Sequence, residues 1–199
     1  MRRTALALAA IAAALASAAA RAEVPAEVRA RAAGVFAALD RIEAERARPV
    51  RAVASSPLPA PGSRRLTFSE AELNAYLACR VDEEMGPYVR SAELKLLAGN
   101  KVEGRVAVDL GKPEAAAALP RKHDLLFAAR FEARDGRIRI DMDKLFLGTQ
   151  PVAPAFVDIL IGAVARLQGV EPMSLEDWYD LPPGVLSLET RPGRVVVIY

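Results

Sequence analysis

Two hydrophobic periods alternate along this chain and divide it into helical and extended segments. Between residues 26 and 48, apolar side chains recur every three or four positions, which predicts an amphipathic helix that ends at Pro49. Its apolar positions are Val28, Ala32, Val35, Phe36, Leu39 and Ile42. Residues 49–65 are rich in proline and are expected to form a partly extended surface loop, in which residues 50–53 can pair as an edge strand.

A capping motif predicts where the next helix begins. The segment from Ser69 to Glu72 has the pattern of a capping box, in which each of these two side chains accepts a hydrogen bond from the backbone N–H of the other. Phe68 and Leu73 occupy the positions of the matching hydrophobic staple. We therefore expect a helix that starts after Ser69 and ends near residues 86–87.

From residue 88 onward the hydrophobic period changes to two, which is typical of strands. Four alternating segments follow, at residues 94–96, 102–110, 125–131 and 138–142. Turn signals separate the first pair at Gly99-Asn100 and the last pair at Asp135-Gly136. The expected structure is an antiparallel meander with one apolar and one charged face.

The last third of the chain predicts a third helix and a hairpin. Residues 156–169 have a wide apolar helical face, and Ser174 can cap a short helical turn at residues 175–179. A type II turn at Pro192-Gly193 should join two closing strands. The last strand, residues 195–199, is apolar on both faces and should be covered on both sides, or lie against a partner or ligand.

These elements together predict the α+β class. The expected architecture is a curved antiparallel sheet, made of the four-strand meander and the C-terminal hairpin, packed against two or three helices. The predicted division of the chain is a leader at residues 1–22, a helix and proline-rich linker at 23–65, and an α+β domain at 66–199.

The leader has the features of a secretory signal peptide. Arg2 and Arg3 precede an alanine–leucine run, and the small-x-small sequence ending at Ala22 predicts cleavage there. The alternative is an uncleaved anchor, but the run is shorter than the ~20 apolar residues of a spanning helix. We expect a periplasmic or secreted protein with no transmembrane segment after cleavage.

Charge and chemistry exclude several classes of function. Cleavage would remove three arginines and leave 24 basic and 25 acidic residues, a net charge of −1, which does not favour nucleic-acid binding. His123 is the single histidine, so neither a catalytic triad nor a zinc site is expected. Asp141 and Asp143 could share a hard cation, but a solvated polar strand face is the interpretation that we favour. No cofactor is predicted.

Cys79 is the single cysteine and has no partner for an intramolecular disulfide. We expect a buried, small apolar residue; an intermolecular bridge or a reactive thiol are the alternatives.

The remaining candidate site is apolar. A hydrophobic pocket between helix and sheet would be lined by Phe68, Leu73, Tyr76, Leu77, Phe127, Phe131, Phe156, Ile159 and Leu160. The alternative is that these residues form an ordinary packed core.

Three short motifs resemble YpmS-like exported bacterial proteins, which are relatives of the tubular lipid-binding folds. They are the segment from Leu66 to Leu77, the step from Leu145 to Val152, and the segment from Leu181 to Val185. The resemblance implies a helix wrapped by a curved antiparallel sheet, and lipid contact, with no catalytic residue.

The sequence thus favours a non-enzymatic exported protein that binds a lipid or another apolar ligand at the bacterial envelope. Two alternatives stay open: an envelope scaffold or assembly partner that uses a sheet edge or the last strand, and a hydrolase with a carboxylate site at Asp141 and Asp143.

Overall fold

The computed structural model describes residues 24–47, 64–84, 89–109, 122–153, 155, 158 and 174–199. The leader, most of the 49–65 loop and the predicted helix 156–169 lie outside or largely outside these ranges. The helices are α2 (Ala26–Ala47) and α3 (Glu70–Glu84). The strands are β1 (Arg65–Ser69), β2 (Val89–Leu97), β3 (Lys101–Asp109), β4 (Lys122–Arg134), β5 (Arg137–Leu147), β6 (Gln150–Pro151), β7 (Tyr179–Asp180), β8 (Ser187–Arg191) and β9 (Arg194–Ile198).

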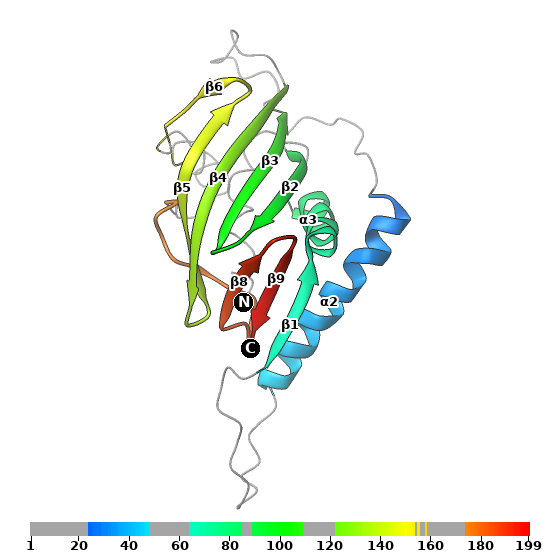
Figure 1. Cartoon of the computed structure of the whole chain (residues 1–199). Helices are drawn as coiled ribbons and strands as arrows, with labels where there is room; N and C mark the ends of the chain where they lie inside the picture. The colour runs from blue at the N-terminus through cyan, green and yellow to red at the C-terminus, as the bar shows by residue number, and fades with distance from the viewer. Residues whose placement is uncertain are drawn as a thin grey trace, which may run out of the picture.

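The meander forms a strongly curled antiparallel sheet, a half-barrel, as Figure 1 shows. Its strand order is β2-β3-β4-β5-β6, and β7 pairs with the other end of β5. Asp135 and Gly136 both have positive φ, 54° and 75°, as a tight two-residue hairpin turn requires. The four predicted strands, both predicted turns and the α+β class are confirmed.

A β-bulge at Asp143 keeps both halves of β5 facing the core. Met142 pairs with Ala129 and Lys144 pairs with Ala128, so Asp143 is an extra residue in the ladder. Before the bulge the even-numbered residue Met142 packs inward, and after it the odd-numbered Leu145 is buried. The inner face therefore stays apolar along the whole strand.

The C-terminal hairpin joins a second sheet that the sequence analysis did not predict. β1, expected as the end of a loop and a helix cap, is a five-residue strand, and the strand order of this sheet is β1-β9-β8. Because β9 lies in the centre, Val195, Val196 and Val197 are all buried, at 5–6% exposure. This confirms that the doubly apolar last strand is covered.

Helix α3 begins with the predicted capping box. The backbone N–H of Ser69 donates to Glu72 Oε2 at 2.8 Å, and the N–H of Glu72 donates to Ser69 Oγ at 3.2 Å. The Ser69 hydroxyl also donates to Glu72 Oε2, at 2.7 Å. The hydrogen bonds that the Glu72 carboxylate accepts, first from the Ser69 side chain and then from the Ser69 backbone, lower the pKa of Glu72.

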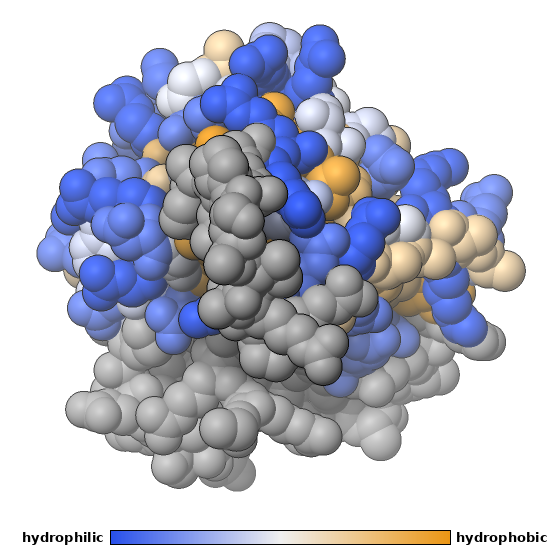
Figure 2. Space-filling model, turned by 90° about the horizontal axis from the view of Figure 1, so that it is seen from below, coloured by the Kyte–Doolittle hydropathy of each residue, from blue (hydrophilic) through white to orange (hydrophobic). Residues whose placement is uncertain are grey.

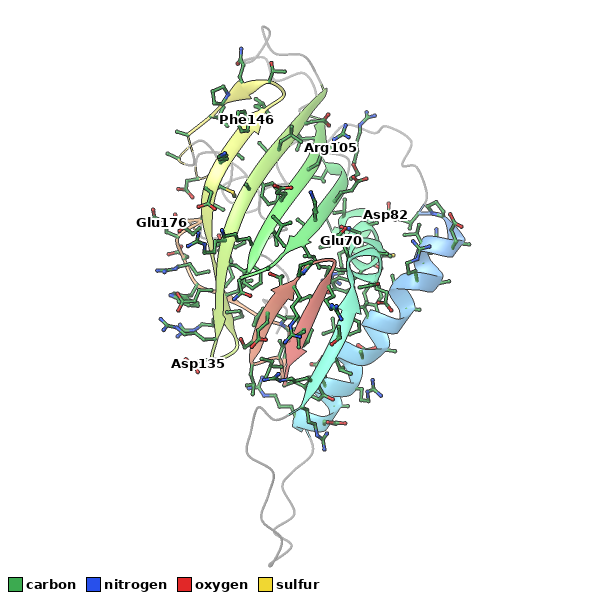
Figure 3. All side chains as sticks on the ribbon, in the orientation of Figure 1. Glu70, Asp82, Arg105, Asp135, Phe146 and Glu176 are labelled. Carbon is green, nitrogen blue, oxygen red and sulfur yellow. The ribbon has the colours of Figure 1, made fainter. Side chains whose placement is uncertain are left out.

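The same helix closes the free edge of β2 with side chains. The Asn74 amide donates to Leu94 O at 2.8 Å and accepts from Leu94 N–H at 2.7 Å, so it replaces a neighbouring strand. Glu70 Oε2 accepts from Leu96 N–H at 2.6 Å, and Leu96 O accepts from Gly193 N–H at 3.0 Å. Figure 3 labels Glu70 where α3, β2 and the β8–β9 hairpin meet. An edge of unpaired backbone groups is thus converted into the joint between sheet, helix and hairpin.

Small residues let α2 pack closely on α3. Ala32 on α2 and Ala75 and Cys79 on α3 form one buried cluster, and the rings of Phe36 and Tyr76 lie 4.8 Å apart beside it. Cys79 is 8% exposed, which confirms the buried interpretation, and desolvation is the main cause that raises the pKa of its thiol.

The C-terminal segment also packs on α2, at Gly184. Ile42, which is 2% exposed, lies so close to Gly184 that a Cβ added there would be 2.7 Å from Ile42 Cγ2. Gly184 also has a φ of +91°. The 23–65 segment therefore contributes residues to the same core as the α+β domain, with Val35, Ala38 and Ile42 packed among residues of β1 and β9.

We expect Asn74→Ala to lower the free energy of unfolding by about 2 kcal/mol, because two half-buried backbone groups of Leu94 lose their partner. Urea unfolding followed by circular dichroism measures this. Glu83→Ala, on the exposed face of the same helix, is the matched control and should change stability by less than about 0.5 kcal/mol. Equal effects of the two variants would contradict the edge-closing role.

Gly184→Ala should destabilise the protein by about 2–3 kcal/mol, because it combines backbone strain with a clash against Ile42. Gly148→Ala is the control: its φ is also positive, +63°, but no atom lies within 4 Å of an added Cβ. Gly148→Ala should therefore show only the loss of stability that backbone strain causes. If Gly184→Ala lowers the stability no more than Gly148→Ala does in thermal unfolding, the close packing of residue 184 on α2 is contradicted.

Candidate apolar binding site

A cavity of about 280 Å³ lies inside the curl of the large sheet, where α2, α3 and the three-stranded sheet converge on it. It separates two apolar clusters, since its walls include Val81 and Phe127 from the cluster beneath the meander and Val35 and Phe68 from the cluster beneath the small sheet. Neither cluster fills the space between them.

The six predicted pocket residues that the structure describes all line this cavity. They are Phe68, Leu73, Tyr76, Leu77, Phe127 and Phe131. Phe156, Ile159 and Leu160 lie outside the described residues. The structure thus brings together side chains from β1, α3 and β4 that are up to 63 positions apart in sequence.

Sequence reasoning missed the walls that α2, β2, β5, β8 and β9 supply. Leu39, Leu94, Ile140, Leu188 and Val197 are examples. Their signal was present as regular helical or alternating apolar periodicity, which shows that a face is apolar. Periodicity does not show which apolar faces meet, and so it could not assign these residues to a common site.

Gly104 makes room for an aromatic wall of the cavity. It pairs with Phe127 across the β3–β4 ladder, and a Cβ added at Gly104 would lie 2.1 Å from Phe127 Cζ. The Phe127 ring therefore lies directly over the Gly104 backbone, which only glycine permits. Phe127 and Phe131 are only half-buried, although both are on the concave side of the sheet.

The cavity wall contains few polar side chains. Among the described lining residues, Arg80, Asp180 and Thr190 carry polar side-chain groups other than the Tyr76 hydroxyl. Arg80 is half-buried, with Nη1 3.6 Å from Oε2 of Glu83, and Asp180 is exposed.

Thr190 is the buried polar member of the wall. Its side chain is 5% exposed, and its Oγ1 has no hydrogen-bond partner. Its backbone N–H is satisfied by Asn100 Oδ1 at 3.0 Å. A buried hydroxyl without a partner costs free energy, so this position is a weak point of the core.

A separate surface cluster surrounds Trp178. The guanidinium carbons of Arg134, Arg137 and Arg139 lie 4.9, 5.7 and 5.4 Å from its ring centroid, within the range of cation–π attraction. Glu132 forms ion pairs with Arg134 and Arg139 at 3.3 and 3.4 Å. The cluster ties the 174–180 segment to the β4–β5 hairpin.

The predicted helical turn at 175–179 is shorter than expected. The N–H of Asp177 donates to Ser174 O at 3.0 Å, which closes a turn, but Tyr179 already belongs to β7. The Tyr179 hydroxyl donates to Ser174 O at 2.7 Å. Desolvation raises the pKa of Tyr179 to about 12. Pairing of β7 with β5 outweighs the helical tendency of this short segment.

The carboxylates considered as a cation site do not gather with others. Asp141 and Asp143 are both exposed on β5, and Asp143 is itself the bulged residue of the strand. Within the described ranges, no three His, Cys, Asp or Glu residues are placed to hold a metal ion. In the same ranges, no helix combines the length and apolar character needed to cross a bilayer.

Figure 2 views the molecule from below, where hydrophilic residues cover much of the described surface and hydrophobic residues show in patches between them. Among the described residues, Leu126 on the outer face of β4 is the large apolar side chain that is exposed, at 39%. Among the described residues, the large apolar side chains are therefore mostly turned away from solvent.

Comparison of the sequence with models of known protein families gives no match, and comparison with curated proteins gives none either. The resemblance to YpmS-like and tubular lipid-binding proteins stays a prediction.

We expect Thr190→Val to raise the free energy of unfolding by about 1 kcal/mol, because valine has nearly the same shape and removes an unpaired buried hydroxyl. Thr67→Val, on the exposed face of β1, is the matched control and should change stability by less than about 0.5 kcal/mol. Chemical denaturation measures both. A clear loss of stability in Thr190→Val would mean that the hydroxyl has a partner in solution.

Proposed function

We propose that this chain is an exported, non-enzymatic protein of the bacterial envelope that binds a lipid or another apolar ligand in the cavity between its helices and its curled sheet. The observation that supports this most directly is the cavity itself. The part of its wall formed by described residues is almost entirely apolar, and several large side chains on it, including Phe127, Phe131 and Ile140, are only half-buried. An apolar ligand would bury this surface further and gain about 25 cal/mol per Å².

The fold is suited to such a site because most of the described lining residues lie on regular elements. Strands β2–β5 fix one wall by their ladders, and the Asn74 and Glu70 hydrogen bonds fix α3 against the edge of β2. A largely preformed apolar pocket binds without a large ordering cost. The signal-peptide features of the leader support a role outside the cytoplasm.

The alternative proposal is an envelope scaffold that acts through the last strand or a sheet edge. Strand β9 is paired with β1 on one side and β8 on the other, and its three valines are buried. The last strand is thus occupied within the chain, which favours ligand binding over this alternative. A role for the outer edges of β1 or β8 would still fit the scaffold proposal.

Binding of 1-decanol by protein purified after expression of the full-length sequence tests the proposed function. We expect measurable binding by titration calorimetry. Ile140→Trp, which adds an aromatic ring to the cavity wall, should weaken binding about tenfold or more, since it takes space that the ligand needs.

Leu126→Trp is the matched control, because it adds the same ring to the outward face of the neighbouring strand. It should bind decanol as the unchanged protein does. Absence of binding by the unchanged protein, or equal weakening by both variants, would overturn the proposal. Native mass spectrometry of the purified protein gives an independent readout, since a retained lipid would appear as a mass increment.

A further inference from the structure

The size of the cavity limits the kind of ligand that it can enclose. An apolar protein cavity of about 150 Å³ holds one benzene molecule, so a cavity of about 280 Å³ has room for about a dozen carbon atoms. This is the volume of one medium-length hydrocarbon chain. The two long chains of a membrane phospholipid exceed it.

The cavity wall also holds a cation in an otherwise apolar helical stripe. Leu73, Tyr76, Leu77 and Arg80 follow one another at i, i+3, i+4 and i+7 along α3, and all four line the cavity. Arg80 therefore takes the place where the stripe would continue with an apolar residue. Its methylene stem can cover apolar surface while the guanidinium stays at the margin.

Of the two charged lining residues that the structure describes, Arg80 is the less open to solvent. Its side chain is 27% exposed, whereas Asp180 is exposed. Charges that are partly buried interact more strongly than exposed ones, since solvent and salt screen them less. The Arg80 guanidinium is thus the less screened of these two charges.

The ion pair between Arg80 and Glu83, one of the interactions of Arg80, is long and exposed. Nη1 and Oε2 are 3.6 Å apart, beyond hydrogen-bond distance, and the Glu83 side chain is 58% exposed. Exposed ion pairs of this kind contribute little. An anionic ligand could add to the existing partners of Arg80 or displace Glu83 at small cost.

We infer that the ligand is a single-chain anionic amphiphile, with its hydrocarbon chain in the cavity and its acidic head group at the Arg80 guanidinium. This inference rests on the proposed function. It adds the number of hydrocarbon chains of the ligand, their length and the charge of its head group. A medium-chain carboxylate is the simplest member of this class.

The test compares decanoate with 1-decanol, which has the same chain without the charge, at about pH 8, where the carboxyl group is ionised. The unchanged protein should bind decanoate about tenfold more tightly, as a hydrogen bond to a charged group contributes. Arg80→Gln should remove this preference by weakening decanoate binding about tenfold, and circular dichroism should show that the variant is folded.

Two further variants separate a specific contact from general electrostatics. Arg80→Lys keeps the charge and should retain most of the preference for decanoate. Arg191→Gln removes one positive charge from an exposed position at the end of β8, outside the cavity lining, and should retain it fully. A preference that falls equally in Arg80→Gln and Arg191→Gln would overturn the assignment of Arg80.

The outcomes distinguish this inference from the proposed function. If the unchanged protein binds neither decanol nor decanoate, both fail. If it binds both with equal affinity, and Arg80→Gln changes nothing, the cavity is an apolar site but the head-group assignment is wrong. If decanoate is preferred and the preference depends on Arg80, the ligand class stands.

Discussion

One exposed backbone edge determines how the parts of this protein fit together. Among the described strands, β2 pairs with β3 alone, and its other edge would present unpaired N–H and C=O groups. Asn74 and Glu70, one helical turn apart on α3, occupy that edge, and Gly193 of the C-terminal hairpin occupies the next backbone group. Because these partners belong to two parts of the chain that lie far apart in sequence, α3 and the C-terminal hairpin, satisfying one edge also positions the helix, the hairpin and the second sheet.

The cavity follows from this arrangement. The joint holds α3 against the edge of the sheet, and the curl of the sheet then leaves space between its concave face and the helices. Close-packed cores leave few voids larger than a water molecule, so a space of about 280 Å³ with an apolar wall needs an explanation. The apolar ligand that we propose would account for it, and the half-buried Phe127 and Phe131 rings are the surface that this ligand would cover.

The charged groups of the described cavity wall differ in their exposure to solvent, and this makes the site electrostatically asymmetric. Arg80 continues the apolar stripe of α3 and is partly shielded, whereas Asp180 is exposed. Elsewhere, arginines are paired with carboxylates or packed around Trp178, as expected for a solvated surface of mixed charge. A cation at the margin of an apolar cavity differs from these surface arginines, because water competes less there for binding to an incoming anion.

The sequence by itself determined the local structure: the capping box at Ser69, the hairpin turn at Asp135-Gly136 and the apolar periodicity of α2 each depend on neighbours within a few residues. It also indicated six of the cavity residues, because large apolar side chains on a helix and on alternating strands must face inward. Only the tertiary structure decided that β1 is a strand, since its five residues gain their partners from β9, some 130 positions later. It alone decided that Asn74 closes an edge and that Arg80 borders a cavity, because the same residue types on an isolated helix would simply face water.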